Sequence, residues 1–328
     1  MRYFFILNPG SKSGKSRKRF ETIIDLFDEA RIDYCYEVTK SLEDATKLSI
    51  YANNEGYDVI VAVGGDGTIN RVLNGFFDGD GNRISKAKMG VVYTGTSPDF
   101  CKSYGIPVDM EEAVKLVLED KSSKIRIGRI VLSNSYSKQY DNKIVDGSGD
   151  FCTRYFACCV NIGLGAALAR RANSGIRGIV GDYAGTFFAL IRTLFTYRPV
   201  EFTLVSDGNR QRESRVYNIS IGRTFYIASG IKVANSLTHN DNGFYNMTVK
   251  NMNIGNWLKT INRVYSGKKI CNDETLSLEY GNVIEVLGNN ECPEIEFDGD
   301  PGGFLPCRID MAAHCLDLIC ESEKGSFK

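Results

Sequence analysis

The sequence is poor in the residues from which most protein metal sites are built. Only two histidines, His239 and His314, occur among 328 residues, and none of the ten cysteines forms a C-x-x-C pair. A zinc site needs such closely spaced thiol and imidazole ligands. We therefore expect no zinc centre, assign both histidines structural roles, and expect the cysteines in apolar runs to pack as small hydrophobic groups.

The chain also lacks an excess of charge of either sign. Forty lysines and arginines balance forty aspartates and glutamates. A nucleic-acid-binding protein usually presents a strong positive field. No nucleic acid partner is therefore expected, and any contact with a membrane surface should be local and transient.

Long hydrophobic runs are absent as well. The nearest is residues 182–197, sixteen residues interrupted by Arg192, whereas a spanning helix needs roughly twenty apolar residues. We expect an amphipathic helix there, packed in a core in preference to lining a lipid groove. The first apolar run is about six residues long and ends at Asn8-Pro9. We therefore expect no signal peptide and a reducing, cytoplasmic location, with peripheral membrane association left open.

The patterns that are present divide the chain into two parts. Residues 1–125 alternate between strand and helix periodicity, which predicts a doubly wound, mainly parallel α/β domain. Such a domain binds its ligands at the carboxyl ends of the strands. The expected strands are 2–7, 33–38, 58–63 and 88–93, and the expected helices are 15–30, 42–54, 68–77 and 110–119.

Residues 126–328 have a different texture. Short alternating runs are separated by turn dipeptides such as Asp207-Gly208, Asn242-Gly243 and Gly281-Asn282, which predicts a C-terminal antiparallel β-sandwich domain. Residues 133–150 are polar and rich in glycine, serine and asparagine, as in a surface loop. A return of the last residues to the first domain is left open.

The most informative motif runs from Val59 to Asn70, where a buried-type strand leads through a glycine-rich turn into a helix. Glycines let backbone N–H groups approach an anion, and the helix start adds positive potential. A carboxylate in this turn would repel bound phosphates unless a divalent cation lay between them. The turn residues are Gly64, Gly65, Asp66, Gly67 and Thr68.

A second phosphate-type loop, residues 8–16, follows the first strand. It resembles a P-loop, but only three residues separate Gly10 from Gly14-Lys15-Ser16, where a P-loop has four. We therefore reject a P-loop nucleotide hydrolase. A loop rich in N–H and hydroxyl donors still suits the outer phosphates of a nucleotide, although a solvated basic turn is the alternative.

A third strand ends in Thr94-Gly95-Thr96-Ser97-Pro98-Asp99-Phe100. This segment resembles the Gly-Thr-x-Asn-Asp-Phe motif of bacterial diacylglycerol kinases, and the Asp66 turn is similar to the turn shared by diacylglycerol, sphingosine and NAD kinases. Residues 154–173 resemble the start of the same family's second domain, and Phe297-Asp298-Gly299-Asp300 resembles its Val-Asp-Gly-Glu motif. In order and spacing the resemblance covers nearly the whole chain.

The resemblance implies an ATP-dependent lipid kinase that also uses Mg²⁺. Asp66 and Asp99 would belong to a magnesium-linked network with Thr96, and Asp298 would be the general base, with Asp300 beside it as a further catalytic residue. A carboxylate that deprotonates the acceptor hydroxyl is also what phosphoryl transfer requires. A plain Asp-Gly turn is the alternative for Asp298. The implied nucleotide-binding residues are Asn8, Ser11, Ser13, Thr39, Gly64, Gly65, Gly67 and Thr68.

Two departures from the family pattern bear on the metal. Arg126 stands where the family usually has an aspartate within reach of the magnesium network. The family's second-domain metal loop, Leu-Asp-Asp-Gly, appears here as Asn240-Asp241-Asn242-Gly243, with one carboxylate fewer. A cation beside a metal lowers metal affinity or replaces part of the metal's charge.

The function expected from the sequence is transfer of the ATP γ-phosphoryl group to a lipid hydroxyl, most simply from ATP to diacylglycerol to give phosphatidic acid. Phosphorylation of a sphingoid base or another lipid, NAD kinase activity, and nucleotide or lipid binding with little turnover are the alternatives. The expected partners are a lipid substrate and, transiently, a membrane surface. A homodimer is left open.

Overall fold

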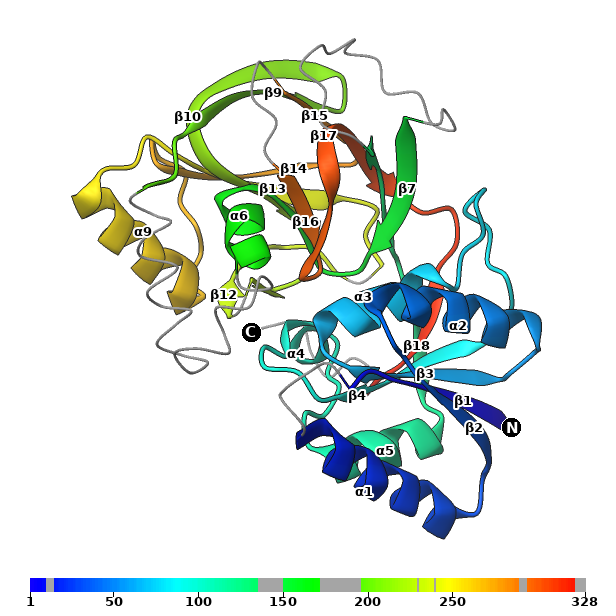
Figure 1. The fold of residues 1–328 in the computed structure, drawn as a ribbon. Helices are drawn as coiled ribbons and strands as arrows, with labels where there is room; N and C mark the ends of the chain where they lie inside the picture. The colour runs from blue at the N-terminus through cyan, green and yellow to red at the C-terminus, as the bar shows by residue number, and fades with distance from the viewer. Residues whose placement is uncertain are drawn as a thin grey trace.

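The computed structural model describes residues 1–9, 15–134, 150–171, 196–228, 230–238, 240–288 and 294–321. Within these residues the chain forms one sheet flanked by helices and one larger antiparallel sheet (Figure 1). Nearly all of the helix expected over residues 182–197 and of the loop expected over residues 133–150 lies outside the described residues.

The first sheet has six strands in the order β2-β1-β3-β4-β18-β5. All neighbouring strands run parallel except β18 and β5, which are antiparallel. All six residues of β3 are buried, because a parallel sheet covered on both faces has no solvent side. The strands are β1 (Arg2–Leu7), β2 (Asp33–Val38), β3 (Val59–Gly64), β4 (Lys88–Tyr93), β5 (Ser122–Ile125) and β18 (Leu316–Ile319).

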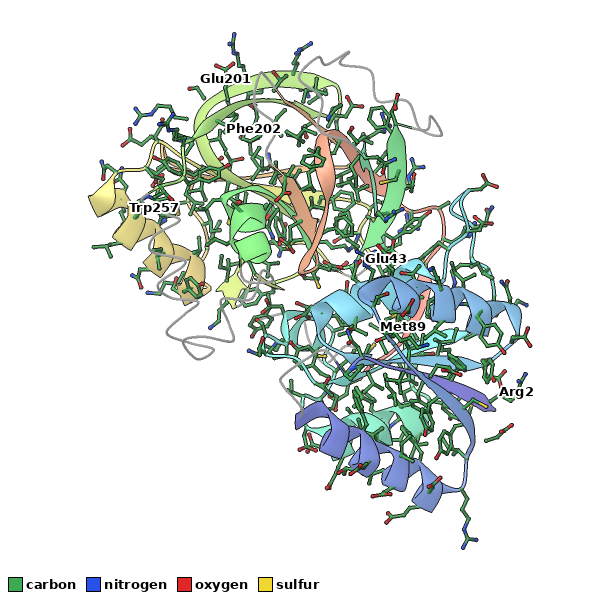
Figure 2. The ribbon with its side chains drawn as sticks, viewed as in Figure 1. Arg2, Glu43, Met89, Glu201, Phe202 and Trp257 are labelled. Carbon is green, nitrogen blue, oxygen red and sulfur yellow. The ribbon has the colours of Figure 1, made fainter. Side chains whose placement is uncertain are left out.

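Helices cover both faces of this sheet. The pair α1 (Lys15–Ala30) and α5 (Met110–Glu119) lies on one face, and the pair α2 (Leu42–Asn54) and α3 (Asp66–Asn74) lies on the other (Figure 1). Met89 of β4 is fully buried between these layers (Figure 2). The doubly wound α/β fold predicted from the sequence is confirmed.

The boundaries of β3 and α3 differ from the sequence expectation, since β3 is shifted by one residue and α3 runs from Asp66 to Asn74. The helix predicted from residue 68 begins at Asp66, because Gly65 has extended geometry and serves as its N-cap. Asp66 is therefore the first residue of α3, where the helix dipole favours a negative charge. The difference places the carboxylate at the helix start instead of in a free turn.

The second sheet is antiparallel and closes on itself. Its main path runs β14-β13-β10-β8-β16-β17-β15-β9, and β9 also pairs with the long, curved β10, with Phe202 of β9 buried inside (Figures 1 and 2). β6 and β7 extend the sheet from β17. The strands are β6 (Gly128–Ser133), β7 (Phe151–Phe156), β8 (Cys159–Gly163), β9 (Val200–Ser206), β10 (Asn209–Gly222), β13 (Phe244–Lys250), β14 (Leu276–Gly281), β15 (Ile284–Gly288), β16 (Glu294–Phe297) and β17 (Asp300–Met311).

This antiparallel second domain was also predicted, together with its turn at Asp207-Gly208. Asp207 and Gly208 both have positive φ and join β9 to β10, as an Asp-Gly hairpin requires. The smaller elements are α4 (Asp99–Ser103), α6 (Leu164–Arg171), α9 (Ile254–Ser266) and the strand pair β11 (Tyr226–Ile227) and β12 (Ile231–Lys232). No helix in the described part of the chain is long and apolar enough to cross a membrane.

Two links connect the domains and lie side by side. The first joins β5 to β6 through Arg126 and Ile127, and the second joins β17 to β18 through residues 312–315. The Ala312 amide donates to the Ile127 carbonyl at 2.9 Å, and the Arg83 guanidinium donates to the Cys315 carbonyl at 2.9 Å. The links therefore form a braced junction at the amino ends of β4 and β18.

Candidate active site

The parallel strands of the first domain end at one edge of the sheet, and backbone hydrogen bonds tie these ends together. The amide of Asn8 donates to Val63 O at 3.0 Å, and the amide of Thr39 donates to Leu7 O at 2.9 Å. The hydroxyl Oγ1 of Thr39 is buried and has no hydrogen-bond partner among the described residues. Asn8 and Thr39, both predicted from the sequence, thus lie at the same edge.

Close packing at the Asp66 turn requires glycine at position 64 and, on the adjoining turn, at position 95. A Cβ on Gly64 would lie 2.5 Å from the Thr68 side chain, and a Cβ on Gly95 would lie 2.8 Å from Gly65 Cα. Thr68 is buried, and its hydroxyl accepts a hydrogen bond from Asn8 Nδ2 at 2.8 Å. By contrast, a Cβ on Gly67 would meet nothing within 4 Å. The turn is therefore tightly packed at Gly64 and open at Gly67. An anion could approach the backbone at the open position, as in an anion-binding turn.

Asp66 is partly buried, its Oδ1 atom is fully buried, and other acidic groups lie near it. Tyr93 donates its hydroxyl to Asp66 Oδ2 at 3.1 Å, whereas Oδ1 has no hydrogen-bond partner among the described residues. Burial, followed by the nearby charges of Asp99 and Asp298, raises the pKa of Asp66 to about 8. Asp99 is itself buried at the start of α4. This excess of buried negative charge is what a divalent cation would neutralise.

The residues present therefore fit a magnesium ion that is shared with a nucleotide. No group of three histidine, cysteine or acidic side chains in the described ranges could hold a metal alone. Magnesium, however, is usually bound by one or two carboxylates together with substrate phosphates and water. Asp66 and Asp99 would supply those carboxylates, while Thr96 is exposed on the adjoining turn.

Asp298 lies in a strained turn between β16 and β17, where both Asp298 and Gly299 have positive φ. Asp298 is 9% exposed, and its carboxylate accepts four hydrogen bonds. The backbone amides of Ala157, Cys158 and Cys159 donate at 2.7, 2.9 and 3.0 Å, and Asn70 Nδ2 donates at 3.2 Å. Burial raises the pKa of Asp298, and the three amides act against that rise.

The turn bearing Asp298 meets the turn bearing Asp66 across the domain boundary. A Cβ on Gly299 would lie 3.6 Å from Asp66 Cβ and 3.9 Å from Gly67 N. Two asparagines of α3 strengthen this contact, because Asn70 and Asn74 each donate to the Tyr155 carbonyl at 2.9 Å. Two aspartates 232 positions apart in the sequence, which we expected to act together, are thus brought to one place.

Three of the predicted residues are not located by their side chains. Ser11 and Ser13 lie in residues 10–14, outside the described part of the chain, and Asp300 is described only as the first residue of β17. Their proposed roles therefore remain predictions.

Glu296 is an acidic residue that the sequence reasoning missed. It is 5% exposed, accepts from Asn161 Nδ2 at 2.8 Å and also accepts from the Gly299 amide. Asn161 in turn accepts from the Ser220 hydroxyl at 2.6 Å. Glu296 therefore anchors the Asp298 turn to β8 and β10. β16 reads Glu-Ile-Glu-Phe, and nothing in this alternating pattern marks Glu296 as a buried residue.

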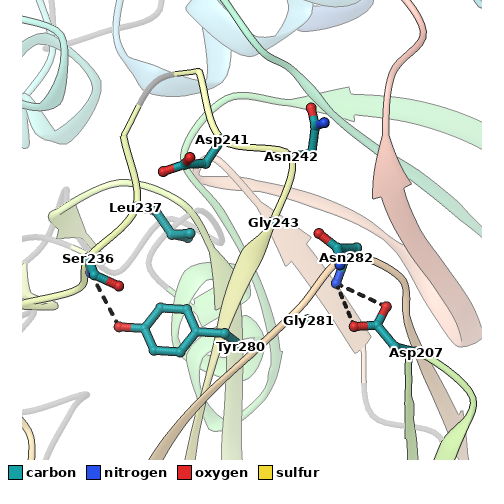
Figure 3. A pocket seen from close by; sticks show the side chains of 9 residues that line it. All are labelled: Asp207, Ser236, Leu237, Asp241, Asn242, Gly243, Tyr280, Gly281 and Asn282. Carbon is teal, nitrogen blue, oxygen red and sulfur yellow. Dashed lines mark hydrogen bonds between the residues drawn. The ribbon is translucent and has the colours of Figure 1, made fainter.

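A pocket of about 440 Å³ lies elsewhere, on the second domain (Figure 3). Tyr280 accepts a hydrogen bond from the Ser236 amide on one side of it, and Asp207 accepts from the Asn282 amide on the other. Its lining consists of Asp207, Ser236, Leu237, Asp241, Asn242, Gly243, Tyr280, Gly281 and Asn282. None of these residues belongs to the Asp66 or Asp298 turns.

Two family models match the chain, one on each domain. The diacylglycerol kinase catalytic domain matches residues 2–130, and the YegS C-terminal NAD kinase beta sandwich-like domain matches residues 158–320. The chain belongs to the diacylglycerol kinase catalytic-domain family. The resemblance seen in the sequence motifs is thereby confirmed.

Relatives match over nearly the full length. The chain is 26% identical to a diacylglycerol kinase of Bacillus subtilis over 322 residues, covering 98% of this chain and 96% of the relative. It is 25% identical to a diacylglycerol kinase of Staphylococcus aureus, covering 97% and 92%. A crystal structure of a putative diacylglycerol kinase from Bacillus anthracis superposes with a TM-score of 0.73 at 20% identity, covering 98% of this chain and 97% of that one. That structural likeness concerns the fold.

Proposed function

We propose that this protein is an ATP-dependent lipid kinase that transfers the γ-phosphoryl group to the hydroxyl of diacylglycerol and forms phosphatidic acid. The observation that carries the proposal is the meeting of the Asp66 and Asp298 turns. One turn offers open backbone donors and the weakly compensated carboxylate of Asp66, and the other offers the oriented carboxylate of Asp298. Phosphoryl transfer needs both kinds of group at one point.

In this proposal the first domain holds the nucleotide. Backbone and hydroxyl donors at the strand ends bind the phosphates, and the buried Thr39 hydroxyl, which has no hydrogen-bond partner in the described part of the chain, turns toward the adenosine. Magnesium, when bound, neutralises charge on the phosphates and on Asp66 and Asp99. The proposed phosphate-binding residues are Asn8, Ser11, Ser13, Gly64, Gly65, Gly67 and Thr68, with Thr96 beside the metal.

Asp298 is the proposed general base. The four donors around its carboxylate fix its orientation, while burial, which raises its pKa, makes it a better proton acceptor. It would take the proton from the lipid hydroxyl as the phosphoryl group is transferred. Asp300, two residues further, is proposed to assist on the same strand. The acceptor would be drawn from the cytoplasmic face of a membrane by transient contact.

Incubation with ATP labelled in the γ-phosphate, Mg²⁺ and diacylglycerol in mixed micelles tests the proposal. We expect label in phosphatidic acid, and no label above background with Asp66→Asn. Parallel reactions with sphingosine, ceramide and NAD separate the other acceptors, which share the ATP site. ATP binding without label in any acceptor would contradict the kinase assignment and favour a binding protein. If NAD alone became labelled, the acceptor would be a nucleotide and the proposed lipid acceptor would be wrong.

A further inference from the structure

The loop that leads into β13 lies next to the domain junction, and the side chains of two arginines donate hydrogen bonds to it. Its described residues are Thr238 and Asn240 to Gly243, and Asp241, Asn242 and Gly243 line the pocket in Figure 3. Small ions therefore reach this loop from solvent. Two arginines approach it from other elements, Arg126 from the link between β5 and β6 and Arg223 from the end of β10.

Both guanidinium groups donate to oxygen atoms of the loop. Arg126 Nη2 donates to Asn242 Oδ1. Arg223 Nη2 donates to the carbonyls of Thr238 and Asp241 at 3.4 and 3.2 Å. Arg223 is only 4% exposed, so its charge is held in place by these contacts and by its surroundings.

The oxygens occupied in this way are those that a divalent cation would need. Magnesium and calcium bind carboxylates, backbone carbonyls and amide oxygens, and the loop offers the Thr238 and Asp241 carbonyls and Asn242 Oδ1. The single loop carboxylate, Asp241, accepts from the Thr238 amide at 2.6 Å. Arginine stays charged at all ordinary pH values, so two guanidinium groups supply a charge equal to that of one divalent ion.

We propose that Arg126 and Arg223 replace a divalent cation at this loop, which itself binds none and is held against the domain junction without metal. The resemblance to the family implied a magnesium site here, and the residues present do not fit one. The proposal is independent of the proposed kinase activity. Its consequence is that Mg²⁺ acts on this protein only through the proposed site at Asp66 and Asp99.

Thermal unfolding with and without Mg²⁺ tests the proposal, in the absence of nucleotide. The full chain with Asp66→Asn serves as background, because that substitution weakens the proposed metal site at Asp66 and Asp99. We expect its Tm to be the same in EDTA and in millimolar MgCl₂. A magnesium-dependent rise in Tm that disappears on adding Asp241→Asn would overturn the proposal, because it would locate a bound cation on the loop.

Reversing the charges should create the site that the arginines now occupy. In the same background, Arg126→Asp with Asn242→Asp should bind Mg²⁺ or Mn²⁺ at least about tenfold more tightly than the unmodified loop. The Tm of this variant should then rise by about 2 °C or more on adding metal. If the variant folds but its Tm does not change on adding metal, the claim that Arg126 keeps a cation out of this loop would be wrong.

A titration of the unmutated protein with Mn²⁺ keeps the test valid if the reversed variant does not fold. Electron paramagnetic resonance counts the bound ions, and the proposal expects at most one, lost with Asp66→Asn. A second ion that persists in Asp66→Asn would overturn it. Arg212→Gln is a matched control, because Arg212 pairs with Glu201 on the exposed side of β10, and its metal response should equal that of the background.

Discussion

The two turns that meet between the domains differ in how many hydrogen bonds their carboxylates accept. Asp66 receives one side-chain hydrogen bond, from Tyr93, and its second oxygen has no partner in the described part of the chain. Asp298 receives four hydrogen bonds, three of them from consecutive backbone amides. The first carboxylate needs an added ligand to be stable as an anion, whereas the protein itself satisfies the second.

This difference teaches that burial alone does not identify what an acidic residue does. Asp66 costs the folded protein stability unless a cation is bound, which is expected of a group selected for binding. Asp298 also fastens α3 to the segment between β7 and β8, so it supports the fold whatever else it does. Substitution at the two positions should therefore separate activity from stability.

Asp298→Ala should have the largest effect, because it acts on both properties. Removing the carboxylate leaves the amides of Ala157, Cys158 and Cys159 without their acceptor, at about 1–3 kcal/mol for each unsatisfied group. Loss of the proposed base should lower the rate of phosphoryl transfer by about two or more orders of magnitude. Urea unfolding and the labelled-ATP assay measure the two effects. A folded variant with near-normal rate would refute the role of Asp298 as base.

Asp298→Asn is the matched control for this experiment. Its amide oxygen can still accept from part of the amide cluster, so it should recover some stability relative to Asp298→Ala. It carries no basic carboxylate, so its rate should stay low. Recovery of both properties together would mean that Asp298 acts only through structure.

Asp66→Asn should lose activity without losing stability. The uncharged side chain keeps the size of aspartate and needs neither the proton nor the cation that the carboxyl group requires when its pKa is raised to about 8, so the metal-free protein should be as stable as the unmutated one or more so. Without the carboxylate that pairs with the metal, turnover should fall by about two or more orders of magnitude. Unfolding in EDTA measures stability. Destabilisation as large as that of Asp298→Ala would show that Asp66 supports the fold as much as Asp298 does, contrary to this prediction.

Asn70→Ala should have a smaller effect, because Asn70 acts through Asp298. It donates to both Asp298 and the Tyr155 carbonyl, whereas Asn74 contacts Tyr155 and Asn70 but makes no hydrogen bond to Asp298 within the described residues. We expect Asn70→Ala to lower kcat about tenfold with KM for ATP little changed. Asn74→Ala is the matched control, with a similar loss of stability and a rate near normal. Equal rates in the two variants would show that Asn70 does not position Asp298.

The first domain and its main turn could be predicted because their signals are local. The buried run of β3, the glycines after it and the 3.6-residue periodicity of the helices are all read within a few residues. The partners of Asp298 could not be predicted, because Asn70 lies 228 positions away and the amide donors about 140. Likewise Arg126 and Asn242 each departed from the family pattern, but their direct contact is visible only in the folded chain. Glu296 escaped notice because a single buried glutamate has no sequence signature.

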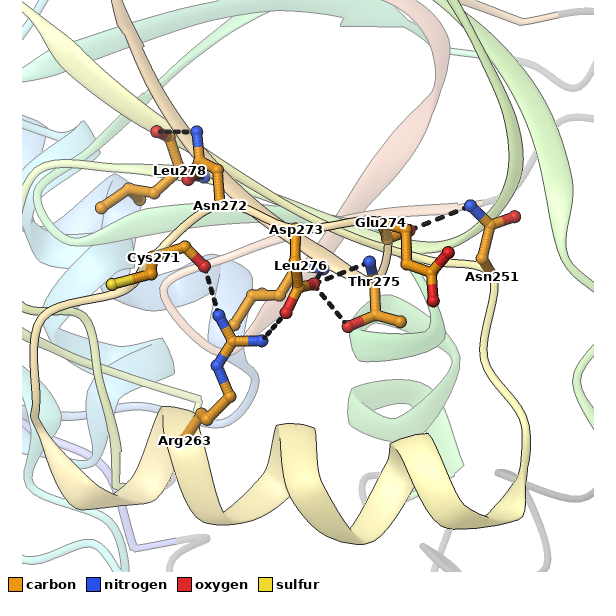
Figure 4. A network of polar contacts seen from close by, with 9 residues as sticks. All are labelled: Asn251, Arg263, Cys271, Asn272, Asp273, Glu274, Thr275, Leu276 and Leu278. Atoms are coloured by element: carbon orange, nitrogen blue, oxygen red, sulfur yellow. Dashed lines mark hydrogen bonds and ion pairs between the residues drawn. The ribbon is translucent and has the colours of Figure 1, made fainter.

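The smallest effect is expected at Asp273, a carboxylate that is hydrogen-bonded through both oxygens and belongs to neither the Asp66 turn nor the Asp298 turn (Figure 4). Its Oδ1 accepts from the amides of Thr275 and Leu276 at 2.8 and 3.0 Å, and Arg263 donates to Oδ2 at 2.6 Å. Partial burial works against ionisation, but the bonds from Thr275, Leu276 and Arg263 hold the pKa of Asp273 well below its usual value of 3.8. Asp273→Asn should lower the free energy of unfolding by about 1 kcal/mol at pH 7.

The pH dependence of that loss gives the sharper test. A carboxylate whose pKa is lower in the folded than in the unfolded state adds stability above the unfolded pKa and loses it as the pH falls toward the folded value. The difference between the unmutated protein and Asp273→Asn should therefore be constant from pH 7 to about pH 5 and shrink below about pH 4. Glu274→Gln, which removes the neighbouring exposed carboxylate, should change stability little at any of these values. A difference that grew on acidification would mean that Asp273, like Asp66, is an acid whose charge the fold opposes.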